Sequence, residues 1–224
     1  MRGVLDCRAG RPCWDYWGMT SDVDMPTVFR PRTGIWFTAI AVVIAGGGLV
    51  SVMATDGPGG LVRAWPLIAV AFGGWWLFWY PVVIFEDRDV TLRNPFTTVR
   101  VPWNALIDVE TKYALKLVTA SGSYTAWAAP APGVWGTHAG KPEDLMDLPV
   151  ISYGLGGSVR PGDLKSTDSG LAAYLARSRW QQLVESGELD VDSPERAQRT
   201  WNWPCIAVAV LLLAVGAAHV GLGS

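Results

Sequence analysis

Three arginines in one short stretch are the residues of this chain best suited to binding chemistry. Arg88, Arg93 and Arg100 could hold phosphate groups, because a guanidinium donates paired hydrogen bonds to phosphate oxygens. Residues 86–116, however, contain as many acidic side chains as basic ones. Each basic residue near an anionic bilayer contributes only about 1 kcal/mol, so this balanced surface predicts neither specific phosphoinositide binding nor, without a basic patch, nucleic-acid binding. We interpret the region instead as a surface for protein contacts, and the candidate interaction surface consists of Arg88, Arg93, Arg100, Trp103 and Trp127.

Side chains that commonly perform catalysis or bind metals are sparse. The two histidines, His138 and His219, have no neighbour that would complete a metal pair. Cys7 and Cys13 are too far apart for the close pairs of a structural zinc site, and a disulfide would not persist in a reducing cytoplasm. The sequence contains no phosphate loop, no His-Glu-x-x-His motif and no nucleophile elbow. We therefore expect no enzymatic activity, no cofactor and no metal.

Three apolar runs, 33–55, 64–85 and 200–222, contain no Asp, Glu, Lys or Arg. A bilayer core about 30 Å thick requires about 20 apolar residues in a helix, so each run is long enough to cross it. The glycines 46–48 favour lipid, where small residues allow close helix packing. A cleaved signal has a shorter apolar region closer to the start, so the sequence predicts three retained spans.

The basic residues near the span ends predict the orientation. Positively charged residues favour the cytoplasmic side, and the short connection 56–63 contains a single Arg. We expect a multi-pass plasma-membrane protein with its N-terminus and residues 86–199 in the cytoplasm and its C-terminus outside. The residues that define this pattern are Arg30, Arg32, Arg88, Arg93, Arg196 and Arg199.

From Val82 the pattern changes to period two, which is typical of half-buried strands. Residues 82–85 and 89–93 predict two strands, followed by a turn at 94–96. Further apolar faces and one aromatic run bring the number to about six short strands within 82–129. They are Val99, Val101 and Trp103; Ile107, Val109 and Thr111; Leu115, Leu117 and Thr119; and residues 124–128. Such spacing predicts a compact antiparallel sheet, sandwich or barrel.

The remaining segments predict connections and one helix. Residues 1–32 predict a disordered tail, within which Met19 and Met25 are alternative start sites, and 130–166 a flexible Gly/Pro-rich loop. Residues 167–187 predict an amphipathic helix that Thr167-Asp168-Ser169 can cap, followed by an acidic linker at 188–199. The helix could cover one end of the β domain or lie on the membrane, and the covering role is favoured because it has few basic residues. Its apolar stripe is Ala172, Ala176, Trp180 and Leu183.

The helix pair followed by 82–95 and by Val99-Arg100-Val101-Pro102-Trp103 resembles the bacterial PH domain-containing membrane proteins of actinobacteria. More narrowly, it is similar to the group named after the mycobacterial low molecular weight protein antigen 6. The resemblance covers residues 27–130 and includes the segments 107–111 and 124–127. It implies a strongly bent antiparallel sheet closed by a C-terminal helix, although the insert before residue 167 departs from a compact PH pattern. It implies a fold and a location rather than an activity.

The fold class expected is therefore three transmembrane helices, two before and one after, with a cytoplasmic PH-like bent antiparallel sheet and a capping helix. We expect a membrane-tethered scaffold that docks a protein partner or assembles with itself. The alternative is a small accessory or sensor subunit that joins a larger membrane complex through its spans.

Overall fold

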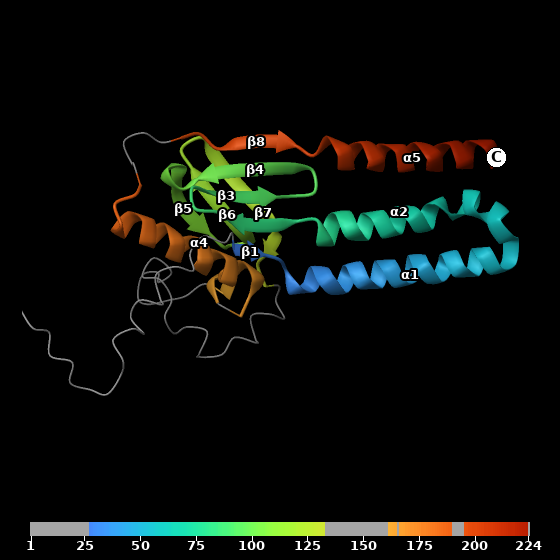
Figure 1. Ribbon diagram of the computed structural model, residues 1–224, viewed down its shortest axis with the longest axis horizontal. Coiled ribbons are helices and arrows are strands. Elements are labelled where there is room, and N and C mark those ends of the chain that lie inside the picture. The colour runs from blue at the N-terminus through green and yellow to red at the C-terminus, as the bar shows by residue number, and fades with distance from the viewer. Residues whose placement is uncertain (1–26, 133–160, 165, 190–194, 224) are drawn as a thin grey trace, which may run out of the picture.

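The computed structural model describes residues 27–132, 161–164, 166–189 and 195–223 (Figure 1). The predictions for Cys7, Cys13, His138 and the alternative start sites lie outside the described residues, as does most of the predicted 130–166 loop. The fold consists of two antiparallel sheets, a covering helix and three long apolar helices that leave one end of the β domain.

A five-stranded antiparallel sheet with the order β1-β2-β3-β4-β8 combines distant parts of the chain. The predicted strands 82–85 and 89–93 are confirmed as β2 and β3. The edge strands correct two predictions: β1 lies in the predicted disordered tail and β8 extends into the predicted acidic linker. These two segments are strands because they pair with β2 and β4. A local sequence pattern does not show such pairing with distant residues. The strands are β1 (Thr27–Phe29), β2 (Val82–Phe85), β3 (Asp89–Arg93), β4 (Thr97–Pro102) and β8 (Gln198–Trp201).

The second sheet has the order β5-β6-β7, formed by Leu106–Glu110, Ala114–Thr119 and Gly122–Pro130. The prediction that Ile107 lies on the apolar face of β5 is wrong, because Ile107 is 62% exposed. Its neighbour Leu106, which is 6% exposed, packs in the core instead. The register between β5 and β6 shifts between Leu106 and Asp108. Such a bulge adds one residue to a strand and turns the following side chain away from its expected face.

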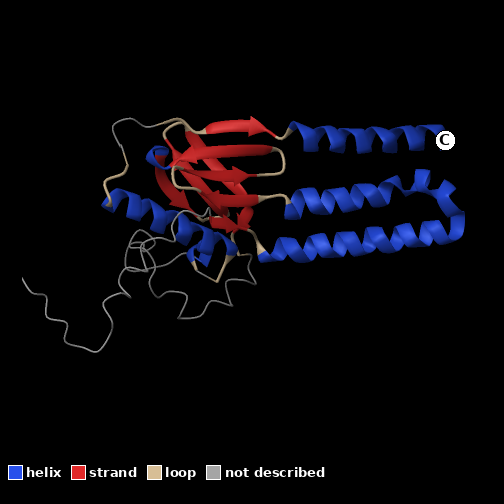
Figure 2. Cartoon of the chain, in the orientation of Figure 1, coloured by secondary structure: helices blue, strands red, loops and turns tan. Residues whose placement is uncertain are grey.

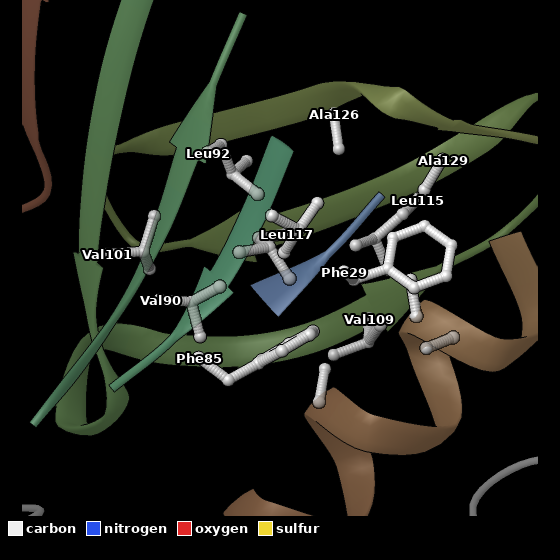
Figure 3. Close-up of a cluster of buried hydrophobic side chains, with 14 of the residues drawn as sticks. Phe29, Phe85, Val90, Leu92, Val101, Val109, Leu115, Leu117, Ala126 and Ala129 are labelled. Carbon is white, nitrogen blue, oxygen red and sulfur yellow. The ribbon is translucent and has the colours of Figure 1, made fainter. Parts of the chain in front are cut away.

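One hydrophobic core lies between the inner faces of the sheets and the helix α4 (Asp168–Glu185) (Figure 3). The predicted cap is confirmed, since the Thr167 hydroxyl accepts a hydrogen bond from the Gly170 N–H at 3.0 Å. Ala172 and Ala176 are fully buried and Leu183 is 5% exposed. The stripe therefore faces the core, which confirms the covering role.

An ion pair missed by the sequence analysis fixes α4 to the β domain. Arg177 Nη1 lies 2.7 Å from Asp163 Oδ1, and both side chains are less than a tenth exposed. Arg177 Nη2 also donates to the Val109 carbonyl oxygen at 2.6 Å, and the Thr111 hydroxyl donates to Asp163 at 2.8 Å. These bonds satisfy a buried carboxylate and hold Pro161–Asp163, a short 3₁₀ turn, against the sheet.

The long helices form two arms and a third rod (Figure 2). The first arm is α1 (Arg32–Asp56), and the rod is α5 (Trp203–Gly223). The second arm consists of α2 (Trp65–Gly74) and a π-helical turn (Trp75–Trp79). A 3₁₀ segment (Gly57–Ala64) joins the two arms. Within the described residues one helix, Thr33–Leu61, is long and apolar enough to cross a membrane by length and composition. Two further apolar helices are shorter, Trp65–Trp79 and Trp203–His219. The predicted runs 64–85 and 200–222 include residues that are not helical, because 82–85 and 200–201 pair as strands in the five-stranded sheet.

Candidate functional site

Side-chain hydrogen bonds and aromatic contacts converge at the junction between the helices and the five-stranded sheet. Only Arg30 and Pro31 separate β1 from α1, only Tyr80 and Pro81 separate the π-helical turn from β2, and only Asn202 separates β8 from α5. Each helix is thus attached directly to a strand of the same sheet (Figure 1). Connections this short leave little freedom for the domain to turn relative to the helices.

The turn between β3 and β4, Asn94-Pro95-Phe96, lies at the centre of this junction. The Trp76 indole N–H donates to the Pro95 carbonyl oxygen at 2.8 Å, and its ring meets the Phe96 ring edge-on with centroids 5.0 Å apart. Trp76 is only 7% exposed, so its N–H needs a partner, and the turn supplies one. The second helical arm is therefore tied to the turn by polar and aromatic contacts together.

Two asparagines extend this link to the other elements. The Asn94 side chain donates to the Thr125 carbonyl oxygen at 2.9 Å and accepts from the Trp127 backbone N–H at 2.8 Å. The Asn202 side chain donates to the Asn94 carbonyl oxygen at 2.7 Å and accepts from the Thr98 hydroxyl at 2.9 Å. One turn thus connects α2, β7 and the start of α5.

Two further hydrogen bonds link the π-helical turn of the second arm to the segment before the first arm and to β7. Arg30 Nη1 donates to the Trp79 carbonyl oxygen at 2.9 Å, and its guanidinium carbon lies 5.2 Å from the centroid of the Trp79 ring. The Trp127 indole N–H donates to the Leu77 carbonyl oxygen at 2.9 Å. Because π-helical geometry and the helix end leave carbonyls without ordinary helical partners, these side chains satisfy groups that would otherwise be exposed.

The predicted interaction residues do not form one surface. Arg93 and Trp127 belong to the junction, where the Arg93 guanidinium carbon lies 5.7 Å from the Tyr80 ring centroid. Arg88 and Arg100 are exposed towards the opposite end of the sheet. The prediction that Trp103 belongs to the interaction surface is wrong, because this residue is 1% exposed and cannot contact a partner. Its indole N–H donates to the Glu86 carbonyl oxygen at 2.9 Å and so closes the β2–β3 turn.

The β2–β3 turn has an acidic rather than a basic character. Burial, together with the nearby Asp89 carboxylate, raises the pKa of Glu86 above its ordinary value of 4.5. Asp87 pairs with Arg179 of α4 at 2.8 Å, so the turn and the covering helix are linked. This arrangement disfavours the binding of a phosphate at the turn, because the phosphate would face carboxylates.

The outer face of the five-stranded sheet carries a row of side chains opposite the core. The registers place Val28 beside Ile84, Ile84 beside Thr91, Thr91 beside Arg100, and Arg100 beside Gln198. Val28 is 51% exposed and Arg100 and Gln198 are exposed, while Thr91 is buried between its neighbours. We call this row the outer-face row. It combines apolar, hydroxyl and cationic groups, as protein-binding surfaces do.

The described residues contain no group of three or more His, Cys, Asp or Glu side chains that could hold a metal ion. The junction itself consists of hydrogen bonds, aromatic contacts and the cation–π contacts of Arg30 and Arg93, which together can fix an orientation.

The comparisons with known proteins concern the segment that follows the second helical arm. Residues 81–139 match the family model of the bacterial PH domain. The match begins at Pro81, the residue before β2, and includes β2 to β7. No curated protein and no solved structure matches the chain. The PH domain therefore lies directly after the second arm, as the resemblance implies, and its antiparallel sheets and covering helix agree with a PH-like fold.

Sequence reasoning missed the junction residues Trp76, Asn94 and Asn202 as a connected group. A weak signal was present, because Asn94 belongs to a predicted turn and the tryptophans mark predicted span ends. Nothing in the local pattern, however, indicates that residue 202 lies beside residue 94. Only the pairing of β8 with β4 brings them together.

Proposed function

We propose that this protein is an integral plasma-membrane scaffold that holds a PH domain at the cytoplasmic surface and docks a protein partner on it. The observation that supports this most strongly is that α1, α2 and α5 all leave one end of one sheet through connections of one or two residues. A domain attached at three points cannot search freely for ligands, but it presents a surface in a constant orientation.

The apolar surface of the helices supports three spans. Trp36 and Val43 of α1 are 71% and 72% exposed, and Leu213 of α5 is 73% exposed. Exposed apolar surface of this extent is unfavourable in water and favourable in lipid. The 25 residues of α1 rise about 37 Å and the 21 residues of α5 about 31 Å, against a bilayer core of about 30 Å. The second arm is shorter, since the 15 residues of α2 and the π-helical turn rise about 22 Å.

The partner is a protein rather than an anionic lipid. The β2–β3 turn is acidic, and the helices already hold the domain at the membrane, so phosphoinositide recruitment would serve no purpose. The outer-face row, including Arg100 and Val28, is the docking surface that we favour, because α4 packs on the opposite side of the core.

The role is binding, without catalysis or cofactor. The motif at 82–103 and the family match support membership in the actinobacterial antigen 6-type group.

Site-specific photocrosslinking in native membranes tests this proposal. A photoreactive residue replaces Arg100 on the outer-face row, and a second variant carries it at Gln182 on the exposed side of α4. We expect a discrete adduct, either with one partner or with a second copy, from position 100 and none from 182. Equal, diffuse labelling from both positions would contradict the scaffold. Cysteine labelling at position 59 from outside and at position 182 only after permeabilisation tests the orientation.

A second function has support from the first helix. A Cβ added to Gly46 or Gly47 would meet no neighbouring atom within 4 Å, so this side of α1 is open to another helix. An accessory subunit would use this side to join a larger membrane complex. Replacing the spans with unrelated apolar helices separates the two functions: the scaffold retains its partner, whereas the subunit loses its complex.

A further inference from the structure

An apolar groove lies beside the junction, between the two helical arms and β7. Its volume is about 390 Å³, and residues of all three elements line it, among them Gly34, Phe37, Leu77, Phe78, Ala126 and Trp127. The volume lies in the range of small-molecule sites. Because the groove is formed where the helices leave the domain, it opens at the level of the lipid headgroups if the helices span the membrane.

A second, polar hollow of about 580 Å³ adjoins the groove. Glu110, Lys112 and Lys116 line it, and Ala114 and Thr125 line both cavities. The two hollows are therefore neighbours, and we call them together the depression; the apolar one lies towards the helices and the charged one on the PH domain. Such a shape fits an amphiphile, whose chain and head differ in polarity in the same way.

Charges of both signs line the polar hollow. Lys116 pairs with Glu110 at 2.6 Å, and the Lys112 ammonium lies 5.1 Å from the centroid of the Tyr113 ring. Two ammonium groups and one carboxylate line the hollow, so a head that carries both signs can place its phosphate at the lysines and its ammonium at Glu110, whereas a purely anionic head would also face Glu110.

We propose that the depression holds one zwitterionic phospholipid of the surrounding bilayer, with an acyl chain in the groove and its head in the polar hollow. The inference rests on the proposed membrane location. The phosphate meets Lys112 and Lys116, the head ammonium meets Glu110, and the chain replaces water against Phe37 and Phe78. The lipid fills the space between the helices and β7 and so completes the attachment of the domain.

Native mass spectrometry of the full chain, extracted from bacterial membranes in mild detergent, tests this inference. We expect one retained phosphatidylethanolamine per chain. Thr125→Trp places a large ring where the two cavities meet, at an exposed strand position, and should reduce lipid retention about tenfold by steric exclusion. Ser123→Trp is the matched control, because residue 123 shares the strand face but does not line the cavities. Lys112→Glu should reduce retention about fivefold, as expected for one charge contact near a surface.

The outcomes separate the inference from the proposed function. Equal retention by the two tryptophan variants would show that the lipid merely surrounds the helices and would overturn the inference. Recovery of a free fatty acid, or preference for phosphatidylglycerol over phosphatidylethanolamine in nanodiscs, would overturn it as well. A chain that stays in the membrane pellet after carbonate extraction but retains no lipid leaves the proposed function intact. Release of the chain from the membrane by carbonate would contradict both the lipid inference and the proposed function.

Discussion

The indole N–H of Trp76 donates to the carbonyl oxygen of Pro95 at 2.8 Å, and this bond ties the second helical arm to the turn between β3 and β4. The same carbonyl lies 3.4 Å from Asn202 Nδ2, at the start of α5. Two helices that are distant in sequence therefore meet at one backbone oxygen of the PH domain.

Trp76→Phe should lower the free energy of unfolding by about 1 kcal/mol, because it removes the N–H donor but keeps an aromatic ring against Phe96. Asn202 limits the loss by remaining near the Pro95 oxygen. Thermal unfolding in detergent measures the change. Trp75→Phe is the control, since Trp75 lies in the same π-helical turn and is 39% exposed. Equal losses in the two variants would show that the bond contributes nothing.

Arg177→Met should lower the free energy of unfolding by about 3–5 kcal/mol, because the Asp163 carboxylate would stay buried without its cation. The double variant Arg177→Met with Asp163→Asn should recover much of this loss, since a neutral amide oxygen can still accept from Thr111. Denaturant unfolding of the three variants gives the coupling. Simple additivity of the two single changes would contradict a direct interaction.

The bulge in β5 predicts opposite effects at two adjacent apolar residues. Leu106→Ala should cost about 2–5 kcal/mol, because Leu106 is 6% exposed in the core. Ile107→Ala should change stability by less than about 0.5 kcal/mol, because Ile107 is 62% exposed. Chemical denaturation of the two variants tests the register. A larger loss at Ile107 would restore the simple alternation that the sequence predicts.

Glu86→Gln should stabilise the protein near pH 7 and have no effect in acid. The folded state raises the pKa of Glu86, so its carboxylate is less favourable there than in the unfolded chain. The favourable contribution of Glu86 is present below its ordinary pKa and is lost as pH rises through the raised value. The gain at pH 7 should reach about 0.5 kcal/mol, since the side chain is partly exposed. Melting temperatures between pH 4 and pH 7.5 measure it.

Glu188→Gln, at an exposed position after α4, is the control for this pH series. Its melting temperature should follow that of the unmodified chain at every pH. If Glu86→Gln also follows the unmodified chain, the electrostatic account of the β2–β3 turn is wrong.

Several elements could be predicted because their causes are local. Alternation of apolar residues predicts β2, β3 and the buried face of β6, with Leu115 and Leu117 fully buried. Thr167 and the stripe that follows it predict the cap and inner face of α4. Such patterns depend on neighbours two to four residues apart, which the sequence displays directly.

The candidate site could be predicted only in part. The sequence analysis assigns Trp103 to an exposed surface, although its ring is buried. An aromatic residue after a strand can turn either way, and the 3₁₀ turn Trp103–Ala105 directs this one inward towards the Glu86 carbonyl.

The sequence alone determined the long apolar helices, the central strands and the covering helix, because hydrophobic periodicity and capping act within a few residues. The tertiary structure alone decided that β1 and β8 complete one sheet, that Arg177 meets Asp163, and that Asn202 meets Asn94. The physical reason is that a strand edge or a buried carboxylate accepts any compatible partner. Which partner pairs with it depends on how long loops close, and the sequence near each residue does not indicate how they close.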